Sequence, residues 1–347
     1  MARAAQPPWR WNSSREQDLF NGRRLLILSE ADVTPLLSMA DAIEAVEHAL
    51  RAQATQHARF PLRNLVRVEN GVLGAMPGAI AGNHPALGAK LVTFFPDNGK
   101  RDLHTHHAVI ALFDESTGVP EAMMDGRYIT EIRTAATSAV ATRALARRDA
   151  QSVAIVGTGV QARAHARALR HVLSLTDLRI WGRNRLSAER LGLELREEGL
   201  PARAVDTVEA ACSDAHVICT VTSAATPVIP AGMPLRGAHI NAVGASTRHN
   251  RELPADLFAR ASLFVDSLEG ALNEAGDLIM AIADNAVPAQ PQMTLLADVV
   301  AGHAPGRTSP EETTIFKSLG IAIEDVACAV LVYERALQHK VGASVKM

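Results

Sequence analysis

The sequence predicts an α/β fold of two parts, a doubly wound parallel sheet domain and a discontinuous α+β domain. Three observations support this prediction. From residue 152 onward, short apolar strands alternate with helices, as in a parallel sheet that is covered on both faces. Between residues 62 and 114, strand-like stretches follow one another with Gly and Asn turns, as in an antiparallel sheet. A long amphipathic segment follows the alternating unit, and we expect it to return to the first sheet.

The first half of the chain begins with a helix and continues with strands. Residues 42–56 have helical spacing of apolar positions, and Ser38 and Asp41 precede them as possible caps. Strands are expected at LRNLVRV, GVLGAM, GAKLVTFF and HHAVIALFD. Residues 128–146 are expected to form a long helix of small residues, which let another backbone or a ligand approach closely.

The second half alternates regularly. SVAIVG is a buried strand that leads through a Gly turn into the helix VQARAHARALRHVL. The strands LRIWG and PARAVD alternate with the helices LSAERLGLELREEG and TVEAACSD, and the strands AHVICTVTS, HINAVGA and SLFVDS follow. Residues 313–339 are expected to form one long amphipathic helix.

Composition limits the classes of protein. The 347 residues suit two domains, and the net charge of −2 gives no basic excess for nucleic acid or an anionic membrane. No apolar run reaches the roughly 18 residues of a membrane span. The first 22 residues lack the apolar core of a signal peptide. The three cysteines have no metal-ligand spacing and are expected to be buried and reduced. We therefore expect a cytoplasmic protein.

The stretch VAIVGTGVQARAH carries the pattern G-x-G-x-x-A at Gly157, Gly159 and Ala162. The first glycine makes a tight turn, the second lets a pyrophosphate touch the backbone, and the small third residue packs helix on strand. Because the pattern lies between a strand and a helix within repeated units, it predicts a Rossmann-type nucleotide site. The alternative is a Gly turn that binds nothing.

The end of the next strand selects the coenzyme. Enzymes that use NAD place Asp or Glu there, roughly 20 residues past the loop, to hold the ribose hydroxyls. This chain has RIWGRNR, with Gly182 in place of a carboxylate and Arg183 beside it. The pattern favours NADPH over NADH, with Arg183 on the 2′-phosphate, whereas solvated arginines are the alternative.

From residue 24 to 340 the chain resembles the ornithine cyclodeaminase/μ-crystallin family. The similarity is strongest in GAKLVTFF, MMDGRYITEIRTAATSAVATRALA, VGTGVQARAH, HINAVGAS, VDSLEGALNEAGD and TIFKSLGIAIEDVACA. The resemblance implies a Rossmann domain joined to a substrate-binding and dimerisation domain, and hence a homodimer. On this basis we divide the chain into a flexible arm (1–23), the first part of the substrate domain (24–145), the NADP-binding domain (146–317) and a C-terminal helix that returns to the first domain (318–347).

The resemblance also implies a substrate cleft. Lys90, in the apolar stretch LGAKLVTFF, matches a cleft lysine, and Arg63 and Arg133 match two arginines that accompany it. Arginine binds a carboxylate through two parallel hydrogen bonds, and lysine can bind a carboxylate or protonate an imine. We expect burial to lower the pKa of Lys90, and the substrate rather than the fold to compensate its charge. Without the family, Lys90 would be interpreted as a strand lysine that either extends its ammonium to solvent (snorkels) or forms a salt bridge.

Further family matches concern the cofactor. His106 matches a histidine beside it, while His104 and His107 have no match, and no neighbouring carboxylate completes a metal site. Glu324 and Asp325 are expected to cap or pair structurally. The positions expected to bind the cofactor are His106, Gly157, Thr158, Gly159, Val160, Gln161, Arg183, Asn184, Thr222, Ser223, Val243 and Leu319.

Two departures narrow the expected activity. Family members that cyclise ornithine carry an aspartate where this chain has Ser246 and a glutamate where it has Gly74. The chain is therefore most similar to the μ-crystallin branch. The resemblance implies NADPH-dependent reduction of cyclic or N-substituted ketimine carboxylates, of the piperideine-2-carboxylate or pyrroline-2-carboxylate type, to L-amino acids, with Lys90, Arg63, Arg133 and Ser246 at the substrate.

Three alternatives stay open. One is reductive amination of a keto acid, as in alanine-dehydrogenase-like members. Another is ornithine cyclisation. The third is a non-enzymatic role in binding NADPH and a small aromatic, thyroid-hormone-like ligand, for which Phe94 could line the pocket.

Overall fold

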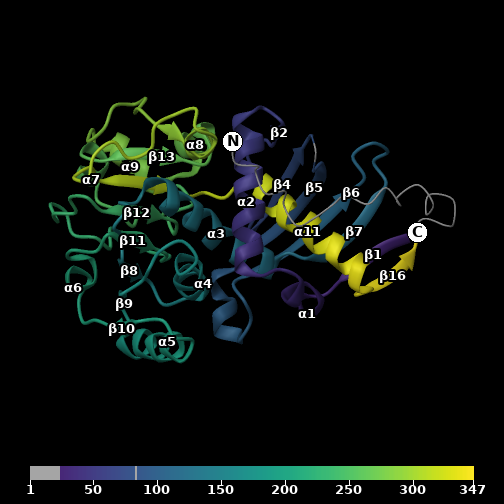
Figure 1. Ribbon diagram of the computed structural model, residues 1–347, viewed down its shortest axis with the longest axis horizontal. Helices are drawn as coiled ribbons and strands as arrows, with labels where there is room; N and C mark the ends of the chain where they lie inside the picture. Colours follow the sequence, from purple (N-terminus) through teal and green to yellow (C-terminus); the bar gives the residue numbers. More distant parts are fainter. Residues whose placement is uncertain (1–23, 83) are drawn as a thin grey trace, which may run out of the picture.

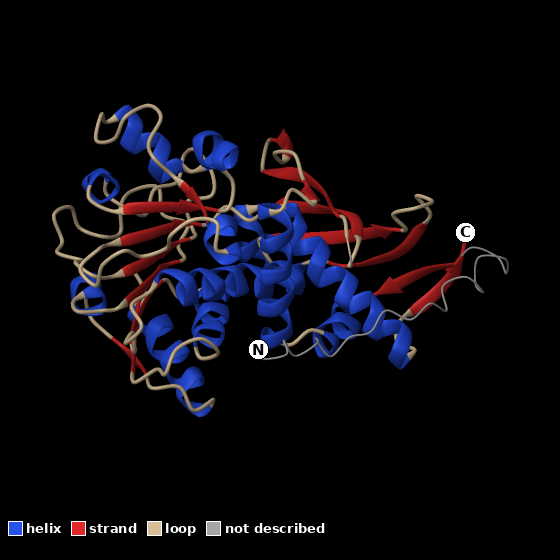
Figure 2. Ribbon diagram, turned by 45° about the horizontal axis from the view of Figure 1, so that its top comes forward, coloured by secondary structure: helices blue, strands red, loops and turns tan. Residues whose placement is uncertain are grey.

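Two sheets organise the molecule in the computed structural model, which describes residues 24–82 and 84–347. The expected arm at residues 1–23 lies outside the described residues. Figure 1 shows the two sheets side by side, with the helices α2, α3 and α11 in and beside the region where they meet. Figure 2 shows helices gathered between the strands of the two sheets.

The first sheet is mixed. Its strands pair antiparallel except for β1 and β7, which run parallel. The predicted strands form β3 to β6, whereas β1, β7 and β16 were not predicted. In spatial order the strands are β16 (Ala343–Lys346), β1 (Arg24–Leu28), β7 (Pro120–Asp125), β6 (His106–Phe113), β5 (Ala86–Phe94), β4 (Gly71–Ile80) and β2 (Ala58–Arg59), with β3 (Asn64–Val68) also paired to β4.

The second sheet is parallel throughout, as the alternating sequence predicts. Its first strand, β8, lies in the interior, and the chain winds outward from it in both directions, as in a doubly wound fold. In spatial order the strands are β10 (Ala202–Ala204), β9 (Asp177–Trp181), β8 (Ser152–Val156), β11 (Val217–Thr220), β12 (His239–Ala242), β15 (Thr314–Lys317), β13 (Ser262–Val265) and β14 (Thr294–Leu295).

The helices cover these sheets. Ser38 caps α2 as predicted, since its side chain accepts a hydrogen bond from the Asp41 backbone while the Asp41 carboxylate bonds back to Ser38. The helices are α1 (Glu30–Val33), α2 (Met39–Ala54), α3 (Arg127–Leu145), α4 (Val160–Leu169), α5 (Arg185–Glu197), α6 (Val208–Cys212), α7 (Ala255–Ala259), α8 (Leu268–Glu274), α9 (Gly276–Ala283), α10 (Leu296–Ala301) and α11 (Ala322–His339), with short 3₁₀ turns η3 (Thr34–Leu36) and η4 (Pro96–Arg101).

Helix α3 connects the two sheets. It contacts β6 of the first sheet and β12 and β15 of the second, and its alanines are buried where its neighbours approach. Two buried polar contacts fix it to the second unit. Nε2 of the His165 ring and the Ser138 hydroxyl are hydrogen-bonded at 2.9 Å, and the Asn241 amide donates to the Thr142 hydroxyl at 2.9 Å. The small residues of α3 therefore serve close packing between the sheets.

The C-terminal segment corrects one prediction. Residues 313–339 were expected to form a single helix, but Thr314–Lys317 form strand β15, buried within the second sheet. The β-branched and aromatic residues there fill a strand between β12 and β13. Gly320 then adopts a left-handed conformation (φ +78°), and α11 begins only at Ala322. Helix α11 packs on β4, β5 and β6 of the first sheet, so the chain crosses from one sheet to the other within four residues, 318–321.

The outer face of the first sheet is apolar and exposed. Strand β5 buries Lys90 toward α11 and points Leu91 outward. Neighbouring strands follow the same alternation. The exposed fractions are 41% for Leu73, 49% for Leu91, 41% for Val109 and 43% for Met123, so this face lacks a cover within the described chain. Within the described residues, no helix is both long and apolar enough to cross a membrane.

Candidate active site

Lys90 lies inside the molecule, on the face of β5 that α11 covers. Its side chain is 2% exposed, and its ammonium lies 2.6 Å from Oδ2 of Asp325, which is fully buried on α11. The other carboxylate oxygen of Asp325 accepts a hydrogen bond from Nε of Arg133 at 2.8 Å. Asp325 therefore bridges two cations that come from β5 and α3.

This bridge corrects the expectation that only a substrate compensates the lysine. The fold supplies a counter-ion, since Asp325 forms a direct ion pair with Lys90. Burial and the charge of Arg133 together lower the pKa of Lys90 to about 8, the expected direction, against the opposing effect of Asp325. Although burial acts in the opposite direction, Arg133 and Lys90 hold the pKa of Asp325 below its usual value. The expected structural pairing of Glu324 and Asp325 is confirmed.

A tight turn at residues 319–321 separates the two arginines. Arg63 donates from Nη2 to the Leu319 carbonyl at 2.7 Å, and its Nε lies 2.8 Å from the Glu274 carboxylate. On the other side, a Cβ at Gly320 would lie 2.2 Å from Nη1 of Arg133, so only glycine fits there. Lys90, Arg133 and Arg63 are thus brought to one place by residues from both sheets.

Two more buried carboxylates hold this turn. Oδ2 of Asp266 accepts the backbone N–H groups of Leu319 at 2.6 Å and Gly320 at 2.7 Å. Oε2 of Glu324 accepts Nη1 of Arg133 at 2.8 Å and the N–H of Ile321 at 3.4 Å. Asp266 directly follows strand β13, while Glu324 opens α11, so the turn is fixed from both units.

The loops predicted to bind the cofactor lie at one edge of the second sheet. They follow the carboxyl ends of β8, β9, β11 and β12, which run parallel and adjacent. This is the edge where ligands bind in open α/β sheets. The positions concerned are Gly157, Thr158, Gly159, Val160 and Gln161 after β8, Arg183 and Asn184 after β9, Thr222 and Ser223 after β11, and Val243 after β12.

The β8–α4 loop has the features that a pyrophosphate requires. Gly157 has φ +138°, and a Cβ there would lie 2.9 Å from the Val221 carbonyl oxygen. At Gly159 an added Cβ would meet nothing within 4 Å, so the backbone is open to a ligand. Gly159 caps α4 without a side-chain bond, which leaves the first N–H groups of the helix to an anion. Oε1 of Gln161 is buried without a hydrogen-bond donor in the described chain.

The end of β9 has no room for a ribose-binding carboxylate. A Cβ on Gly182 would lie 2.5 Å from the Thr158 methyl group. Arg183 is exposed and forms no ion pair or hydrogen bond within the described residues. Arg185, by contrast, is bound to Glu189 at 2.8 Å and also to Asp206. Asn184 uses its side-chain oxygen to cap α5, accepting the Ser187 N–H at 3.0 Å.

A buried acid network supports the loops after β11 and β12. The Glu252 carboxylate accepts the Thr222 N–H at 2.5 Å, the Thr222 hydroxyl at 2.7 Å and the Gly244 N–H at 2.8 Å. The Glu252 backbone N–H is bound by Asp277, which pairs with Lys317 at 3.1 Å. All three charged residues are fully buried. The position of Thr222 is therefore set by a network that the sequence did not reveal.

The remaining predicted residues lie as follows. His106 has an exposed surface and stacks beside Phe94 with ring centroids 4.5 Å apart. Desolvation by the neighbouring chain and the charge of Lys90 lower its pKa. Leu319 is buried in the turn that Arg63 and Asp266 hold. Ser246 is half-buried in the loop after β12, and no described contact joins it to Lys90. Among the described residues, no group of His, Cys, Asp and Glu is arranged to hold a metal ion.

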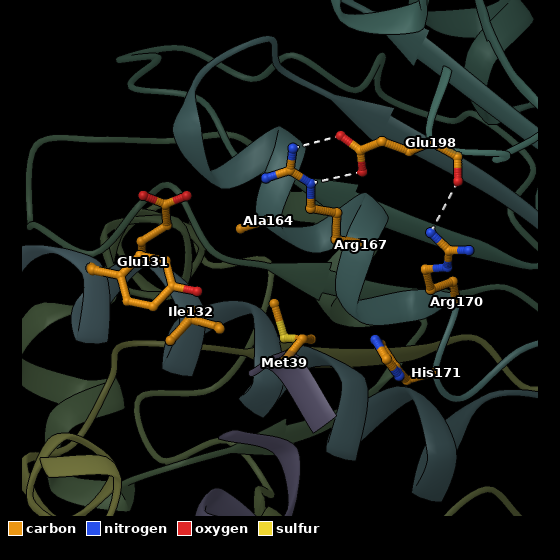
Figure 3. A pocket seen from close by; sticks show the side chains of 9 residues that line it. Met39, Glu131, Ile132, Ala164, Arg167, Arg170, His171 and Glu198 are labelled. Carbon is orange, nitrogen blue, oxygen red and sulfur yellow. Dashed lines mark hydrogen bonds and ion pairs between the residues drawn. The ribbon is translucent and has the colours of Figure 1, made fainter. Parts of the chain in front are cut away.

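Two cavities differ in their relation to these residues. A narrow cleft is lined by Arg63, Met76, Glu274, Leu319 and Gly320 among others, so it opens at the arginine-bearing turn. A larger cavity of about 270 Å³ lies between α2, α3, α4 and the end of α5 (Figure 3). None of the predicted site residues lines it. Its charges bind each other, with Arg167 Nε donating to the Glu198 carboxylate at 2.9 Å and Arg170 to the Glu198 carbonyl at 3.2 Å.

Several supporting residues were missed at the level of sequence. Asp266 directly follows the apolar run LFV, and Lys317 directly follows the run TIF. In both cases a charged residue at the end of an apolar strand could have indicated a buried ion. Glu252 and Asp277 carried no such signal. Their partners are backbone groups and side chains from other loops.

Comparisons with known proteins identify the family of the chain. The model of the ornithine cyclodeaminase/mu-crystallin family matches residues 23–340. Ketimine reductase mu-crystallin of Mus musculus is 40% identical over 276 residues, which are 79% of this chain and 84% of that protein.

Two solved structures have similar folds. Delta(1)-pyrroline-2-carboxylate reductase of Thermococcus litoralis, in complex with NADH and L-proline, superposes with a TM-score of 0.89 at 38% identity, covering 92% of this chain and 100% of that one. An archaeal alanine dehydrogenase dimer with bound NAD has a TM-score of 0.89 at 34% identity, covering 93% and 99%.

The Lys90–Asp325 bridge gives a prediction about stability. Asp325→Asn leaves the buried Lys90 without an anion and should lower the free energy of unfolding by about 3–5 kcal/mol. Lys90→Met leaves Asp325 paired with Arg133 alone and should lower it by less. The double variant removes both charges and should be more stable than the sum of the two losses implies. Denaturant unfolding of the four proteins measures this coupling. The matched control is Lys100→Met, which breaks the exposed Lys100–Asp97 pair and should leave stability unchanged. Additive losses would show that the two side chains do not stabilise each other.

Proposed function

Because the chain belongs to the ornithine cyclodeaminase/mu-crystallin family, we propose that it is an enzyme that reduces cyclic or N-substituted ketimine carboxylates to L-amino acids with NADPH. The observation that carries this proposal is the convergence of Lys90, Arg133 and Arg63 on the 319–321 turn. Three buried or half-buried cations beside a dinucleotide edge suit a small anion that must be held close to a cofactor.

In this proposal four side chains have separate roles in binding the substrate and protonating it. Arg63 and Arg133 bind the substrate carboxylate, for which guanidinium groups have matching geometry. Lys90 donates a proton to the imine nitrogen. Its pKa of about 8 makes it a better acid near neutral pH than an ordinary lysine. Asp325 holds the Lys90 ammonium in place and limits how far its pKa falls.

The expected cofactor site suits a nicotinamide dinucleotide. When bound there, NADPH would supply the hydride for the imine carbon. Residues 157–161 would hold the pyrophosphate, and Arg183 the 2′-phosphate. The free, exposed guanidinium of Arg183 and the crowding at Gly182 support NADPH rather than NADH. Thr222, Ser223, Val243, Leu319 and His106 would line the nicotinamide side.

Two positions argue against ornithine cyclisation by this chain. Neither Gly74 nor Ser246 offers a carboxylate to an amine. A Cβ added at Gly74 would lie 3.2 Å from Leu65 and 3.4 Å from Val92, so a longer side chain would have to displace its neighbours. The site is therefore proposed to accept substrates that already carry a C=N bond.

We also propose that the protein is a homodimer, with a substrate domain at 24–145 and 318–347 and a Rossmann domain at 146–317. The exposed apolar face of the first sheet supports association of two copies. The archaeal alanine dehydrogenase is a dimer with the same fold. All three cysteines are free and buried, which supports the proposed cytoplasmic location.

A substrate panel tests the proposed activity. Oxidation of NADPH, followed by absorbance, is measured with Δ1-piperideine-2-carboxylate and Δ1-pyrroline-2-carboxylate, and formation of pipecolate or proline is confirmed. L-Ornithine with NAD should release little or no ammonia. No turnover of either cyclic imine, or rapid ammonia release from ornithine, would contradict the proposal.

A second candidate activity is supported by the similarity to alanine dehydrogenase. That enzyme's fold matches with a TM-score of 0.89, so reductive amination of a keto acid fits the same site. Pyruvate with ammonia is therefore included in the panel. A higher kcat/KM with pyruvate and ammonia than with either preformed imine would favour this second activity.

Arg183 gives a prediction about coenzyme choice. Arg183→Ala should weaken NADPH binding by about 1.5–3 kcal/mol, roughly ten- to a hundredfold, because a charge-assisted contact to phosphate is lost. NADH binding should change little. Fluorescence titration with both coenzymes measures the effect, and Arg190→Ala, on the exposed side of α5, is the control. Equal affinity of the wild type for NADH and NADPH would refute the assignment.

Lys90 gives a prediction about pH dependence. The protonated form of Lys90 is the active one, so kcat/KM for the imine should fall as pH rises through about 8. Lys90→Met should lower kcat/KM by at least about a hundredfold and leave NADPH affinity unchanged. The alkaline limb should be absent from its residual activity. An unchanged limb in Lys90→Met would assign it to the substrate or to another group.

Leu91 gives a prediction about assembly. Leu91→Glu places a charge in the middle of the exposed apolar face and should convert the dimer to a monomer, because a buried unpaired carboxylate opposes association. Analytical ultracentrifugation measures the change. The control is Leu186→Glu, an exposed leucine on α5 of the second unit. A dimer that persists in Leu91→Glu would place the interface elsewhere.

A further inference from the structure

Two buried carboxylates at the 319–321 turn each have an oxygen without a donor. Asp266 uses only Oδ2, and Glu324 uses only Oε2. Oδ1 of Asp266 and Oε1 of Glu324 are buried, and neither has a hydrogen bond of normal geometry within the described residues. The Thr137 hydroxyl faces the Glu324 carboxylate, but it donates to the Arg133 carbonyl at 2.9 Å. A buried carboxylate oxygen without a partner is costly as an anion and is relieved by a proton.

The charges around this turn do not balance if every group is ionised. The buried cations are Lys90 and Arg133, and the buried carboxylates are Asp266, Glu324 and Asp325, which gives 2 − 3 = −1. At the rim, Arg63 and Glu274 form an ion pair with each other, and Arg248 also acts on Glu274. A substrate carboxylate would bring the sum to −2 in a region that water hardly reaches. Excess charge of this kind is strongly unfavourable in a medium of low polarity.

Each arginine that would bind the substrate is already engaged. Nη1 of Arg133 is held by Glu324 at 2.8 Å and Nε by Asp325 at 2.8 Å, while Arg63 is held by Glu274 at 2.8 Å. An incoming carboxylate must therefore compete with an internal one. Neutralising the internal carboxylate removes that competition.

We propose that the substrate carboxylate binds together with one proton, which the carboxylate of Glu324 takes up from solvent. The proton adds to a Glu324 oxygen and forms a carboxylic acid, and no bond of the substrate changes in this step. Arg133 is thereby released from one of its two internal anions and can turn Nη1 to the substrate. This inference rests on the proposed function, since it requires an anionic substrate at Arg63 and Arg133.

The surroundings favour Glu324 over the other carboxylates. Asp325 lies between two cations, which hold its pKa below the usual value despite burial. Burial raises the pKa of Asp266 too, but two backbone N–H groups that donate to it act in the opposite direction and stabilise its anion. The groups that face Glu324 are Arg133 and Thr137 on α3, Asp325 and Cys328 on α11, and Asp266 after β13. Burial raises the pKa of Glu324 to about 7, and the charges of Asp266 and Asp325 add to the effect against that of Arg133.

The expected uptake depends on pH. At pH 7 a group with a pKa of about 7 is about half protonated, so full protonation on binding takes up about half a proton per site. At pH 8 the uptake by Glu324 approaches about one proton. Lys90, with a pKa of about 8, also gains protons when an anion binds, but at pH 7 it contributes only about a tenth of a proton.

Calorimetry measures the uptake directly. Pyrrole-2-carboxylate, a planar anion without an ammonium group that cannot react with NADPH, is titrated into the NADPH complex of the enzyme in buffers of different ionisation enthalpy at pH 6, 7 and 8. The slope of the observed enthalpy against buffer ionisation enthalpy is the number of protons taken up. We expect a small slope at pH 6, about half a proton at pH 7, and more at pH 8. L-Proline is the second probe. Because its own ammonium can exchange a proton on binding, it reports whether the site is occupied rather than how many protons Glu324 takes up.

Variants assign the proton. Glu324→Gln should reduce the uptake at pH 7 to about a tenth of a proton, the share of Lys90. Glu274→Gln tests the other releasable carboxylate and should leave the uptake in place. The control Glu194→Gln, which loses a surface pair with Arg163, should also leave it in place. Thermal unfolding checks that each variant is folded, and the pH dependence of the wild type stands without any variant.

The outcomes separate the two proposals. Binding of pyrrole-2-carboxylate with no proton uptake at pH 7 and 8 would overturn the inference and leave the proposed function intact. Uptake that is lost in Glu274→Gln but kept in Glu324→Gln would assign the proton to Glu274 and overturn the inference. If neither L-proline nor pyrrole-2-carboxylate binds the NADPH complex, the proposed substrate site fails, and the inference fails with it.

Discussion

The ion bridge from Lys90 through Asp325 to Arg133 is the interaction on which the arrangement of this molecule depends. It joins β5, α3 and α11, which are far apart in the sequence, by two contacts of 2.6 and 2.8 Å among buried groups. Buried ions of opposite charge stabilise a fold only when each retains its partner. The bridge therefore requires α11 to lie on the first sheet. Since β15 is buried in the second sheet, the four residues between them must cross from one sheet to the other. Gly320 makes that crossing possible, because Arg133 occupies the space of any larger side chain.

Much of the fold could be predicted because it follows from local rules. Alternation of apolar strands and helices predicts a parallel sheet, and parallel neighbours bring the loops after β8, β9, β11 and β12 to one edge without further information. The glycine pattern at 157–162 then locates the cofactor edge. Strand β15 was assigned to a helix because a short apolar run has no period of its own. Its state is decided by its neighbours β12 and β13, which contact both of its edges.

The candidate site was only partly predictable, because ion partners are set by the tertiary fold. The sequence marked Lys90 as unusual in an apolar strand, but its counter-ion lies on a helix at the other end of the chain. Glu252 and Asp277 were missed since they bind mainly backbone groups of other loops. Strand β5 is another case in which the sequence pattern alone was not sufficient. Periodicity places Lys90 and Leu91 on opposite faces, but only the packing of α11 shows that the lysine is buried and the leucine exposed.

A site whose cations already have internal partners selects its ligands by exchange. Arg63 and Arg133 are each bound to carboxylates of the chain, and a neutral ligand cannot displace those carboxylates from the arginines. A ligand carboxylate can replace Glu274 or Glu324 as the partner of an arginine. If one proton enters the site with it, the net charge of the site stays nearly constant, and the hydrogen bonds that the ligand gains then decide whether it binds. Internal pairing also keeps the empty site stable, since no arginine is buried without an anion. The same network that stabilises the fold in the absence of substrate would thus exclude uncharged imines and favour those that carry a carboxylate beside the C=N bond.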